Sequence, residues 1–293
     1  MKTGFVATIG FFDGVHLGHR HLLQQVLEVA HARDLNSMVV TFSQQPRHVV
    51  SHETKHFYLL TTTEEKLNLL HQTGINLCKV LEFTPELATL SAFEFMQLLH
   101  EQYQVLALVI GYDHRFGHNR SEGLDDYIRY GHELGIEVIQ ATELPSASST
   151  RIRELLLSGD LETANTLLGY HYILEGKVVN GFHVGHTIGF PTANLQILPE
   201  KLIPANGVYA VMVEMDNKKY QGMLNIGTRP TLANGDGRSI EVHIFNFNDD
   251  IYDKELRLSL VKRTRCEVKF ATKGQLVQQL QRDATMIKEI LAS

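Results

Sequence analysis

The stretch IGFFDGVHLGHR, residues 9–20, decides how the first half of this chain folds. It follows an apolar run at residues 5–9 that predicts a buried β-strand, and it leads into residues 17–32, where apolar side chains recur at helical spacing. The turn between strand and helix carries two glycines and two histidines, which are Gly10, Gly14, His16 and His19. Such a turn points backbone N–H groups and the positive end of a helix dipole at one place, which favours the binding of a phosphate.

The two histidines of this turn are three residues apart, so at the start of a helix His16 and His19 share one face. Imidazole groups in that position can donate hydrogen bonds to phosphate oxygens as charge develops on them. Histidine pairs at this spacing also occur in zinc sites, but the sequence has no HExxH motif and no cysteine or third ligand near the pair. We therefore interpret the pair as phosphate-binding groups.

Composition limits the classes of function. The chain has 293 residues, 43% hydrophobic and 20% charged, which is typical of a globular protein with one large domain or two ordinary ones. Its net charge of −6 argues against a general nucleic-acid-binding surface, so any anion site must be local. Cys78 and Cys266 predict no disulfide framework, which fits the cytoplasm. No apolar stretch approaches the roughly eighteen residues of a membrane span or forms a signal peptide, so we expect no membrane partner.

Up to about residue 168 the sequence alternates between expected strands and expected helices. Strands are expected at residues 5–9, 37–42, 77–81, 107–111 and 137–141, and helices at residues 17–32, 63–72, 91–101 and 125–134. Apolar strands separated by helices indicate a parallel, doubly wound sheet, the α/β part of the fold. Ligands of such sheets bind at the carboxyl ends of the strands.

Unusual polar segments follow four of these strands. They read FFDGVHLGH, SQQPR, YDHRFGHNR and SASSTRIR, in chain order. Because the carboxyl ends of parallel strands meet at one edge of the sheet, we expect the four segments to converge there. Three of the four are basic, which favours an anionic substrate.

After residue 169 the pattern changes to closely spaced strands. They are expected at residues 173–179, 208–215, 219–226, 239–245 and 256–268, with turn signals such as the Asn-Gly pair at 180–181 between them. A helix is expected only at residues 273–291. This half is predicted to be all-β, a small antiparallel barrel closed by a C-terminal helix. We place the boundary so that the domains cover residues 1–168 and 169–293.

The informative string of the second half is GFPTANL, residues 189–195. Thr192 and Asn194 bring a hydroxyl and an amide oxygen close together, and such hard oxygen ligands suit Mg²⁺ that is bound together with phosphates. Taken alone, PTAN is also typical of an ordinary proline turn, and Glu241 of a solvent-facing residue in an alternating strand. The order and spacing of GFPTANL, GVYA, NIGTRPT and EVHIF favour a functional reading.

The string G-x-F-D-G-x-H-x-G-H resembles the HxGH signature of the nucleotidylyltransferase superfamily. Within that superfamily it is similar to the N-terminal module of bacterial bifunctional riboflavin kinase/FAD synthetases. The four strings of the second half, in their order, resemble the riboflavin kinase module that usually follows. The resemblance covers roughly residues 8–283. It implies an enzyme that phosphorylates riboflavin with ATP to give FMN, then adenylylates FMN with a second ATP to give FAD and pyrophosphate, with Mg²⁺.

The resemblance also implies roles for individual residues. In the first module the catalytic residues are His16, His19 and Arg151. ATP would be bound there by Gly10, Phe12, Asp13, Gly14, Ser148, Ser149 and Thr150, and the flavin by Asp113 and Arg115. In the second module Thr192 and Asn194 would bind Mg²⁺ and nucleotide. Glu241 would be the base for the ribityl hydroxyl, a role that typically contributes ~10²–10⁴ in rate.

Several positions depart from the family's usual pattern. They are Phe11, Gln45, His114, His186, Asn246 and Asp253. Two alternative functions follow. One is a nucleotidylyltransferase for another phosphorylated substrate, such as a phosphopantetheine or choline phosphate, because HxGH alone does not exclude it. The other is a non-catalytic relative that binds a flavin nucleotide.

Overall fold

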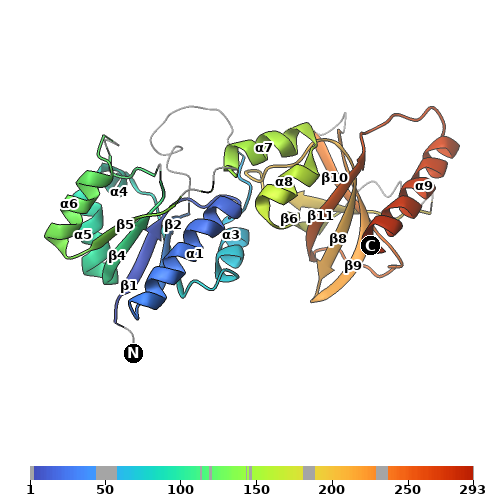
Figure 1. Ribbon diagram of the computed structural model, residues 1–293. Helices are drawn as coiled ribbons and strands as arrows, with labels where there is room; N and C mark the ends of the chain where they lie inside the picture. The colour runs from blue at the N-terminus through green and yellow to red at the C-terminus, as the bar shows by residue number, and fades with distance from the viewer. Residues whose placement is uncertain are drawn as a thin grey trace. The chain divides into compact units, whose positions relative to one another are not determined.

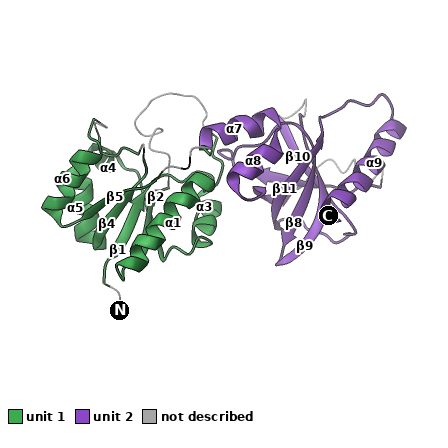
Figure 2. Ribbon diagram, in the orientation of Figure 1, with its two compact units in different colours: residues 1–148 green, residues 149–293 purple. Residues whose placement is uncertain are grey.

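The computed structural model describes residues 3–43, 58–112, 114–118, 121–142, 144, 147–180, 189–228 and 237–292. The chain forms two compact units, residues 1–148 and residues 149–293 (Figure 2). The parallel sheet and the antiparallel barrel with its terminal helix are both confirmed. Within the described residues, no helix combines the length and the apolar character needed to cross a bilayer.

The first unit is built on a five-stranded parallel sheet with the strand order β3-β2-β1-β4-β5. Its strands are β1 (Phe5–Ile9), β2 (Asn36–Phe42), β3 (Leu77–Leu81), β4 (Val105–Ile110) and β5 (Glu137–Gln140). Its helices are α1 (Leu17–Ala32), α3 (Thr63–His71), α4 (Pro85–Thr89), α5 (Ala92–Tyr103) and α6 (Leu124–Leu134). Figure 1 shows α1 and α3 on the opposite side of the strands from α5 and α6.

Strand β1 occupies the middle of this sheet and is buried on both faces. Val6 and Ala7 are fully buried, and β1 pairs in parallel with β2 on one side and β4 on the other. The strand order therefore changes direction at β1, and ligands of open α/β sheets bind at such a point. The segment that leaves the carboxyl end of β1 is the HxGH turn.

The second unit is a closed barrel with the strand order β10-β7-β6-β11-β8-β9. Its strands are β6 (Tyr172–Val179), β7 (Ala193–Ile197), β8 (Gly207–Met215), β9 (Lys218–Thr228), β10 (Arg238–Ile244) and β11 (Glu255–Arg265). Its helices are α7 (Ser149–Ser158), α8 (Leu161–Leu168) and α9 (Lys273–Ala292). The sequence did not predict β7, because the Pro-Thr-Ala-Asn string was interpreted as a ligand-binding segment or a proline turn.

One asparagine of helix α8, Asn165, forms hydrogen bonds to two strands of the barrel. The amide Nδ2 of Asn165 donates to the carbonyl of Leu260 on β11 at 2.9 Å, and its Oδ1 accepts from the backbone N–H of Tyr172 on β6 at 2.8 Å. Helices α7 and α8 accordingly belong to the compact second unit. The boundary of the two catalytic modules, placed after residue 168, stays a prediction.

Helix α9 covers one outer side of the barrel. Its Ile287 is fully buried in a cluster with Val208, Ala210, Met223 and Phe245. Asp283 of α9, 1% exposed, accepts hydrogen bonds from Arg265 Nε at 3.0 Å and from Arg265 Nη2 at 2.7 Å. Gln279 donates to the same carboxylate. A buried carboxylate therefore fixes the helix to the end of β11.

Replacing this carboxylate should loosen α9. Asp283→Ala leaves the half-buried Arg265 guanidinium without its partner, which typically costs about 3–5 kcal/mol. We expect faster amide hydrogen exchange in residues 273–292, measured by mass spectrometry. Lys262→Ala on the same strand is the matched control, because Lys262 pairs with Glu162 at the surface and such pairs contribute below about 1 kcal/mol. Equal exchange in both variants would contradict this account.

Candidate active sites

The HxGH turn has an unusual backbone. Positive φ angles occur at Phe12 (55°), Gly14 (81°) and Val15 (37°). A β-branched residue with positive φ is strained, and such strain persists only where the surrounding structure enforces it. Part of the enforcement is local, because the N–H of Val15 donates to the carbonyl of Phe12 at 3.1 Å. The N–H of Gly14 donates to Thr61 Oγ1 at 3.0 Å, which ties the turn to a distant segment.

Asp13 makes the strongest attachment of the turn to that segment. Its carboxylate is 4% exposed and accepts from the N–H of Leu60 at 3.1 Å and the N–H of Thr61 at 3.0 Å. The Thr61 hydroxyl donates to it as well, at 3.2 Å. These contacts fix the turn against the chain that leads into α3. The role of Asp13 in ATP binding stays a prediction beside this structural one.

His16 caps the N-terminus of α1. Its Nδ1 accepts a hydrogen bond from the N–H of His19 at 3.3 Å, and the residue is 5% exposed. The two rings are stacked, with centroids 3.7 Å apart and an angle of 17° between the planes. Because Nδ1 is the acceptor, the neutral His16 ring carries its proton on Nε2. The predicted sharing of one face by the two histidines is therefore observed.

The surroundings of His19 favour its neutral form. Burial, followed by the charges of His16, Lys66 and His114, holds the pKa of its imidazole well below the usual range. Its Nδ1 is buried and makes no hydrogen bond to the described residues. Buried polar atoms nearly always have a partner, so this exception indicates a functional position.

The segment after β5 reaches the same turn. A Cβ atom built on Gly18 would lie 3.1 Å from the carbonyl oxygen of Ala147 and 3.1 Å from Cε1 of His16. A larger residue at this position would crowd both groups, so the two segments approach each other closely here. Two of the four polar segments, those after β1 and β5, thus come together as predicted.

The segment after β4 contributes a cavity of about 480 Å³ at the carboxyl ends of β4 and β5. Its lining includes Gly111, His114, Arg115, Tyr127 and Gln140. Arg115, a predicted flavin ligand, is therefore in a cavity. Asp113, the other predicted flavin ligand, and Gln45 in the segment after β2 lie outside the described residues.

The residues predicted to bind pyrophosphate lie at the start of α7. Ser149 is the first residue of this helix, and Ser148 precedes it. Arg151 forms an exposed ion pair with Glu154, Nη1 to Oε2, at 3.3 Å. The division between the two compact units falls between residues 148 and 149. The association of Ser149, Thr150 and Arg151 with the histidine pair stays a prediction.

In the second unit, strand pairing gathers the three predicted residues. Glu241 on β10 lies opposite Asn194 on β7 and opposite Asn225 on β9. The Thr192 hydroxyl lies 3.4 Å from Glu241 Oε2. Ile240 and Val242 are buried, so Glu241 points to the opposite, outer face of the barrel. The structure thus brings Thr192, Asn194 and Glu241 together.

His243 holds the proline turn next to Glu241. Its Nδ1 lies 2.7 Å from the carbonyl oxygen of Pro191, and its ring contacts Phe190 and Phe245 edge to face. Burial lowers the pKa of His243, and the charge of Lys288 adds to this effect. Neutral His243 therefore donates through Nδ1. The role of His243 was not predicted from the sequence, although its position two residues after Glu241 places it on the same strand face.

A second cavity of about 480 Å³ adjoins Thr192. It is lined by backbone and side chains of β7 and β10 and of the segment that follows β10, among them Pro191, Thr192, Phe247, Asp249 and Tyr252. It combines apolar and acidic walls beside the hydroxyl of Thr192. No group of three or more His, Cys, Asp or Glu side chains suited to a metal ion occurs in the described parts of the chain. The oxygen atoms of Thr192, Asn194 and Glu241 do suit Mg²⁺ that shares phosphate ligands.

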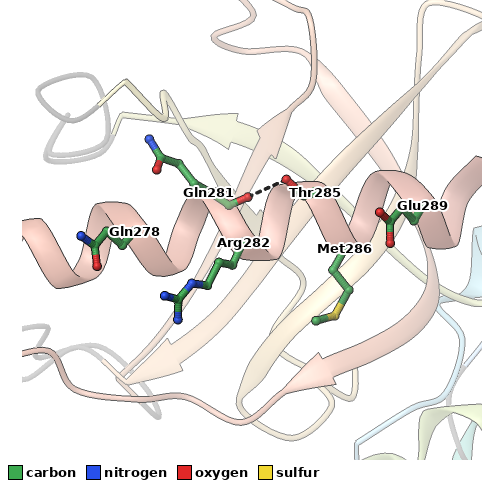
Figure 3. A pocket seen from close by; sticks show the side chains of 6 residues that line it. All are labelled: Gln278, Gln281, Arg282, Thr285, Met286 and Glu289. Atoms are coloured by element: carbon green, nitrogen blue, oxygen red, sulfur yellow. Dashed lines mark hydrogen bonds between the residues drawn. The ribbon is translucent and has the colours of Figure 1, made fainter.

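A further hollow of about 480 Å³ runs along α9 (Figure 3). Its lining residues are Gln278, Gln281, Arg282, Thr285, Met286 and Glu289. All six come from one helix, and the Thr285 hydroxyl bonds back to the carbonyl of Gln281 at 3.1 Å. It contains none of the predicted site residues.

The described departures from the family pattern fit their surroundings. Asn246 and Asp253 have positive φ angles of 54° and 63°, a conformation that Asn and Asp tolerate better than other side chains. The ring of Phe11 lies under the ammonium group of Lys66 at 4.2 Å, and the ring of His114 stacks on Phe116 at 6.2 Å. His186 lies outside the described residues.

Comparison with known proteins matches both units. A family model described as FAD synthetase matches residues 1–154, and one described as riboflavin kinase matches residues 168–291. The "Bifunctional riboflavin kinase/FMN adenylyltransferase" of Listeria monocytogenes is 35% identical over 95% of this chain and 90% of its own. The protein of the same name from Escherichia coli K12 is 37% identical over 98% and 93%. A crystal structure from Streptococcus pneumoniae, described as a "Macrolide-efflux Protein", is 32% identical with a TM-score of 0.88, over 98% of this chain and 95% of its own.

The protonation of His19 is a direct test of the first site. Since its folded pKa lies below the unfolded value, we expect NMR to show a neutral ring at pH values well below 6.5. The unfolded chain binds this proton more readily, so His19 should reduce stability as the pH falls through its unfolded pKa. His16→Asn keeps a capping oxygen but removes the neighbouring ring, and it should raise the His19 pKa. A wild-type pKa at or above 6.5 would refute this description.

Proposed function

This chain belongs to the family of bifunctional riboflavin kinases/FMN adenylyltransferases, and we propose how its two units divide the work. The protein is an enzyme of FAD biosynthesis that acts through FMN. In our proposal the barrel unit phosphorylates riboflavin with ATP, and the parallel-sheet unit adenylylates FMN with ATP. The observation that supports this division most is the pair of separate residue groups, one in each unit. They are His16 with His19, and Thr192 with Asn194 and Glu241.

The kinase reaction begins with a poor nucleophile. The primary hydroxyl of riboflavin must lose its proton as it attacks the γ-phosphorus of ATP and ADP leaves, and Glu241 is the base we assign to that proton. Bound Mg²⁺ would neutralise phosphate charge in this reaction. Thr192 and Asn194 would hold it together with the nucleotide phosphates. His243 supports the arrangement, because its bond to the Pro191 carbonyl fixes the backbone immediately before Thr192.

The cavity beside Thr192 is our candidate for the nucleotide of the kinase. Phe247 and Pro191 give this cavity apolar walls that suit a nucleobase. Thr192, which we propose binds the phosphates together with Asn194, also lines it. A ring system on apolar walls and phosphates on hydroxyl and amide groups is the usual division of such a pocket. Riboflavin would then approach Glu241 from the remaining part of the outer barrel face.

Adenylyl transfer poses the opposite problem. The FMN phosphate is already an anionic nucleophile, so no base and no covalent intermediate are needed, but two anions must come together. The phosphate oxygen attacks the α-phosphorus of ATP, and pyrophosphate leaves. His16 Nε2–H and the His19 ring would donate to the α-phosphate as charge builds up. The backbone of Gly10, Phe12 and Gly14 would supply further N–H groups.

The remaining assignments complete the first site. Pyrophosphate would be bound by Ser148, Ser149, Thr150 and Arg151, since hydroxyl groups, helix N–H groups and a guanidinium all suit that anion. The cavity that Arg115 lines would take part of FMN, with Asp113 close by in sequence. We also propose a cytoplasmic location, which fits the free thiols of Cys78 and Cys266.

The alternatives do not explain both units. A nucleotidylyltransferase for another substrate would need the histidine pair but not the grouping of Thr192, Asn194 and Glu241 on the barrel. A non-catalytic flavin binder would need neither a base beside a hydroxyl nor stacked imidazoles at a helix N-terminus. The observed geometry favours the bifunctional enzyme.

Single substitutions should separate the two reactions. Glu241→Gln removes the base with little change of shape, so FMN formation should fall by ~10²–10⁴ while FAD formation from supplied FMN persists. His16→Ala should do the reverse. Both products are measured by liquid chromatography with riboflavin or FMN, ATP and Mg²⁺. Loss of both steps in either folded variant would contradict independent sites.

Mg²⁺ binding at the barrel can be tested through Thr192. Thr192→Val keeps the shape but removes the hydroxyl, so the KM for MgATP in FMN formation should rise about tenfold or more. Removal of Mg²⁺ with EDTA should stop FMN formation, and added Mg²⁺ should restore it. Thr166→Val on the exposed side of α8 is the control and should change neither quantity. A wild-type KM for MgATP in Thr192→Val would contradict the assignment of Thr192 to the Mg²⁺ and nucleotide site.

A further inference from the structure

A buried lysine lies at the carboxyl ends of β1 and β2. Lys66 of α3 is 2% exposed. Its Nζ donates to the carbonyl of Phe42, the last residue of β2, at 2.8 Å. It also donates at 3.1 Å to the carbonyl of Phe11, which lies between β1 and the histidines, and it sits over the Phe11 ring. Lysine is almost never fully buried unless it is paired or functional.

We propose that Lys66 is a positioning residue for FMN adenylylation, whose ammonium group fixes the Phe11 carbonyl at the start of the HxGH turn and places a buried positive charge at that turn. The inference rests on the proposed function of the first unit. Lys66 acts through the turn and through His19, since its ammonium group contacts the carbonyls of Phe11 and Phe42 and the ring of Phe11.

The mechanical part of this role follows from the strained backbone. The Phe11 carbonyl accepts from Lys66 Nζ and from the Thr41 hydroxyl, both at 3.1 Å. Phe12, with its positive φ, is the next residue. Asp13 then holds the middle of the turn through Leu60 and Thr61. The start and the middle of the turn are thus tied to the same region, the first turn of α3 and the residues before it.

The electrostatic part concerns the histidine pair. Lys66 is one of the three charged groups that lower the pKa of His19, beside His16 and His114. Lys66 itself has a pKa lowered to about 8, chiefly by burial, while the carboxylate of Asp13 opposes that shift. The Glu65 carboxylate, its neighbour on α3, accepts from the N–H of Thr62. A positive charge at this place favours neutral His19, which can donate a hydrogen bond, and attracts anionic substrates.

The sign of the pH dependence follows. Lys66 is charged well below its pKa of about 8, and it progressively becomes neutral as the pH rises through that value. The kcat/KM for FAD formation from FMN should therefore decline above about pH 8 in the wild-type protein. Riboflavin phosphorylation takes place in the other unit, so its kcat/KM should not decline when Lys66 loses its proton.

The experiment compares three full-length variants with the wild type. Lys66→Met should lower kcat/KM for adenylylation by at least about tenfold, because the turn that carries the histidines would be displaced. It should also abolish the decline of kcat/KM near pH 8. Lys66→Arg keeps the charge at all these pH values and should stay active above pH 8, where the wild type declines. Lys79→Met is the control, because Lys79 also lies over an aromatic ring, that of Tyr103 on the same unit, but away from the turn. It should behave as the wild type.

Folding is checked by hydrogen exchange of β1 and β4 in each variant. A folded Lys66→Met protein with the wild-type kcat/KM for adenylylation and the wild-type pH profile would overturn this inference but leave the proposed function intact. If Lys66→Met does not fold, a decline near pH 8 that persists in Lys66→Arg would overturn it. A wild-type protein that makes no FAD from FMN would overturn the proposed function itself.

Discussion

Both candidate sites depend on a turn whose backbone is fixed by side chains from elsewhere in the same unit. In the first unit the Asp13 carboxylate accepts from Leu60 and Thr61, and this holds the turn that carries the histidine pair. In the second, His243 bonds to the carbonyl of Pro191 and fixes the chain before Thr192. Groups that are placed before the substrate arrives need not be reorganised during the reaction, and such preorganisation is a major source of catalysis.

The two units meet different chemical demands with different groups. The chain has a net charge of −6, yet FMN carries a phosphate, so the groups that favour an anion must be concentrated at small sites. A neutral alcohol needs a base, and the barrel presents Glu241 beside a hydroxyl and an amide. An anionic phosphate needs none, and the parallel-sheet unit presents stacked imidazoles at a helix N-terminus. In our proposal the base and the imidazole pair lie in different units because the two reactions take place in different units.

Much of the fold could be predicted because its signals are local. The apolar runs and helical periods of the first half predicted the parallel sheet, and the closely spaced strands of the second half predicted the barrel. Contacts between distant residues leave no such trace, which is why the roles of Thr61, Lys66 and His243 were missed. Strand β7 was also missed, because its identity as a strand becomes clear only from its pairing with β10. That pairing places Asn194 opposite Glu241. The motifs predicted a set of site residues, and strand pairing explains how two of them, Asn194 and Glu241, come to lie opposite each other.

The central claim is that one chain holds two independent sites joined by FMN, which one site releases and the other accepts. The most direct measurement mixes two full-length variants, purified Glu241→Gln and purified His16→Ala, with riboflavin, ATP and Mg²⁺. Each variant is expected to lack one of the two activities. Neither variant alone should make FAD from riboflavin. The mixture should make FAD after a lag in which free FMN accumulates, because each variant retains the site that the other lacks. A mixture that forms no FAD, while wild-type protein does, would contradict the account.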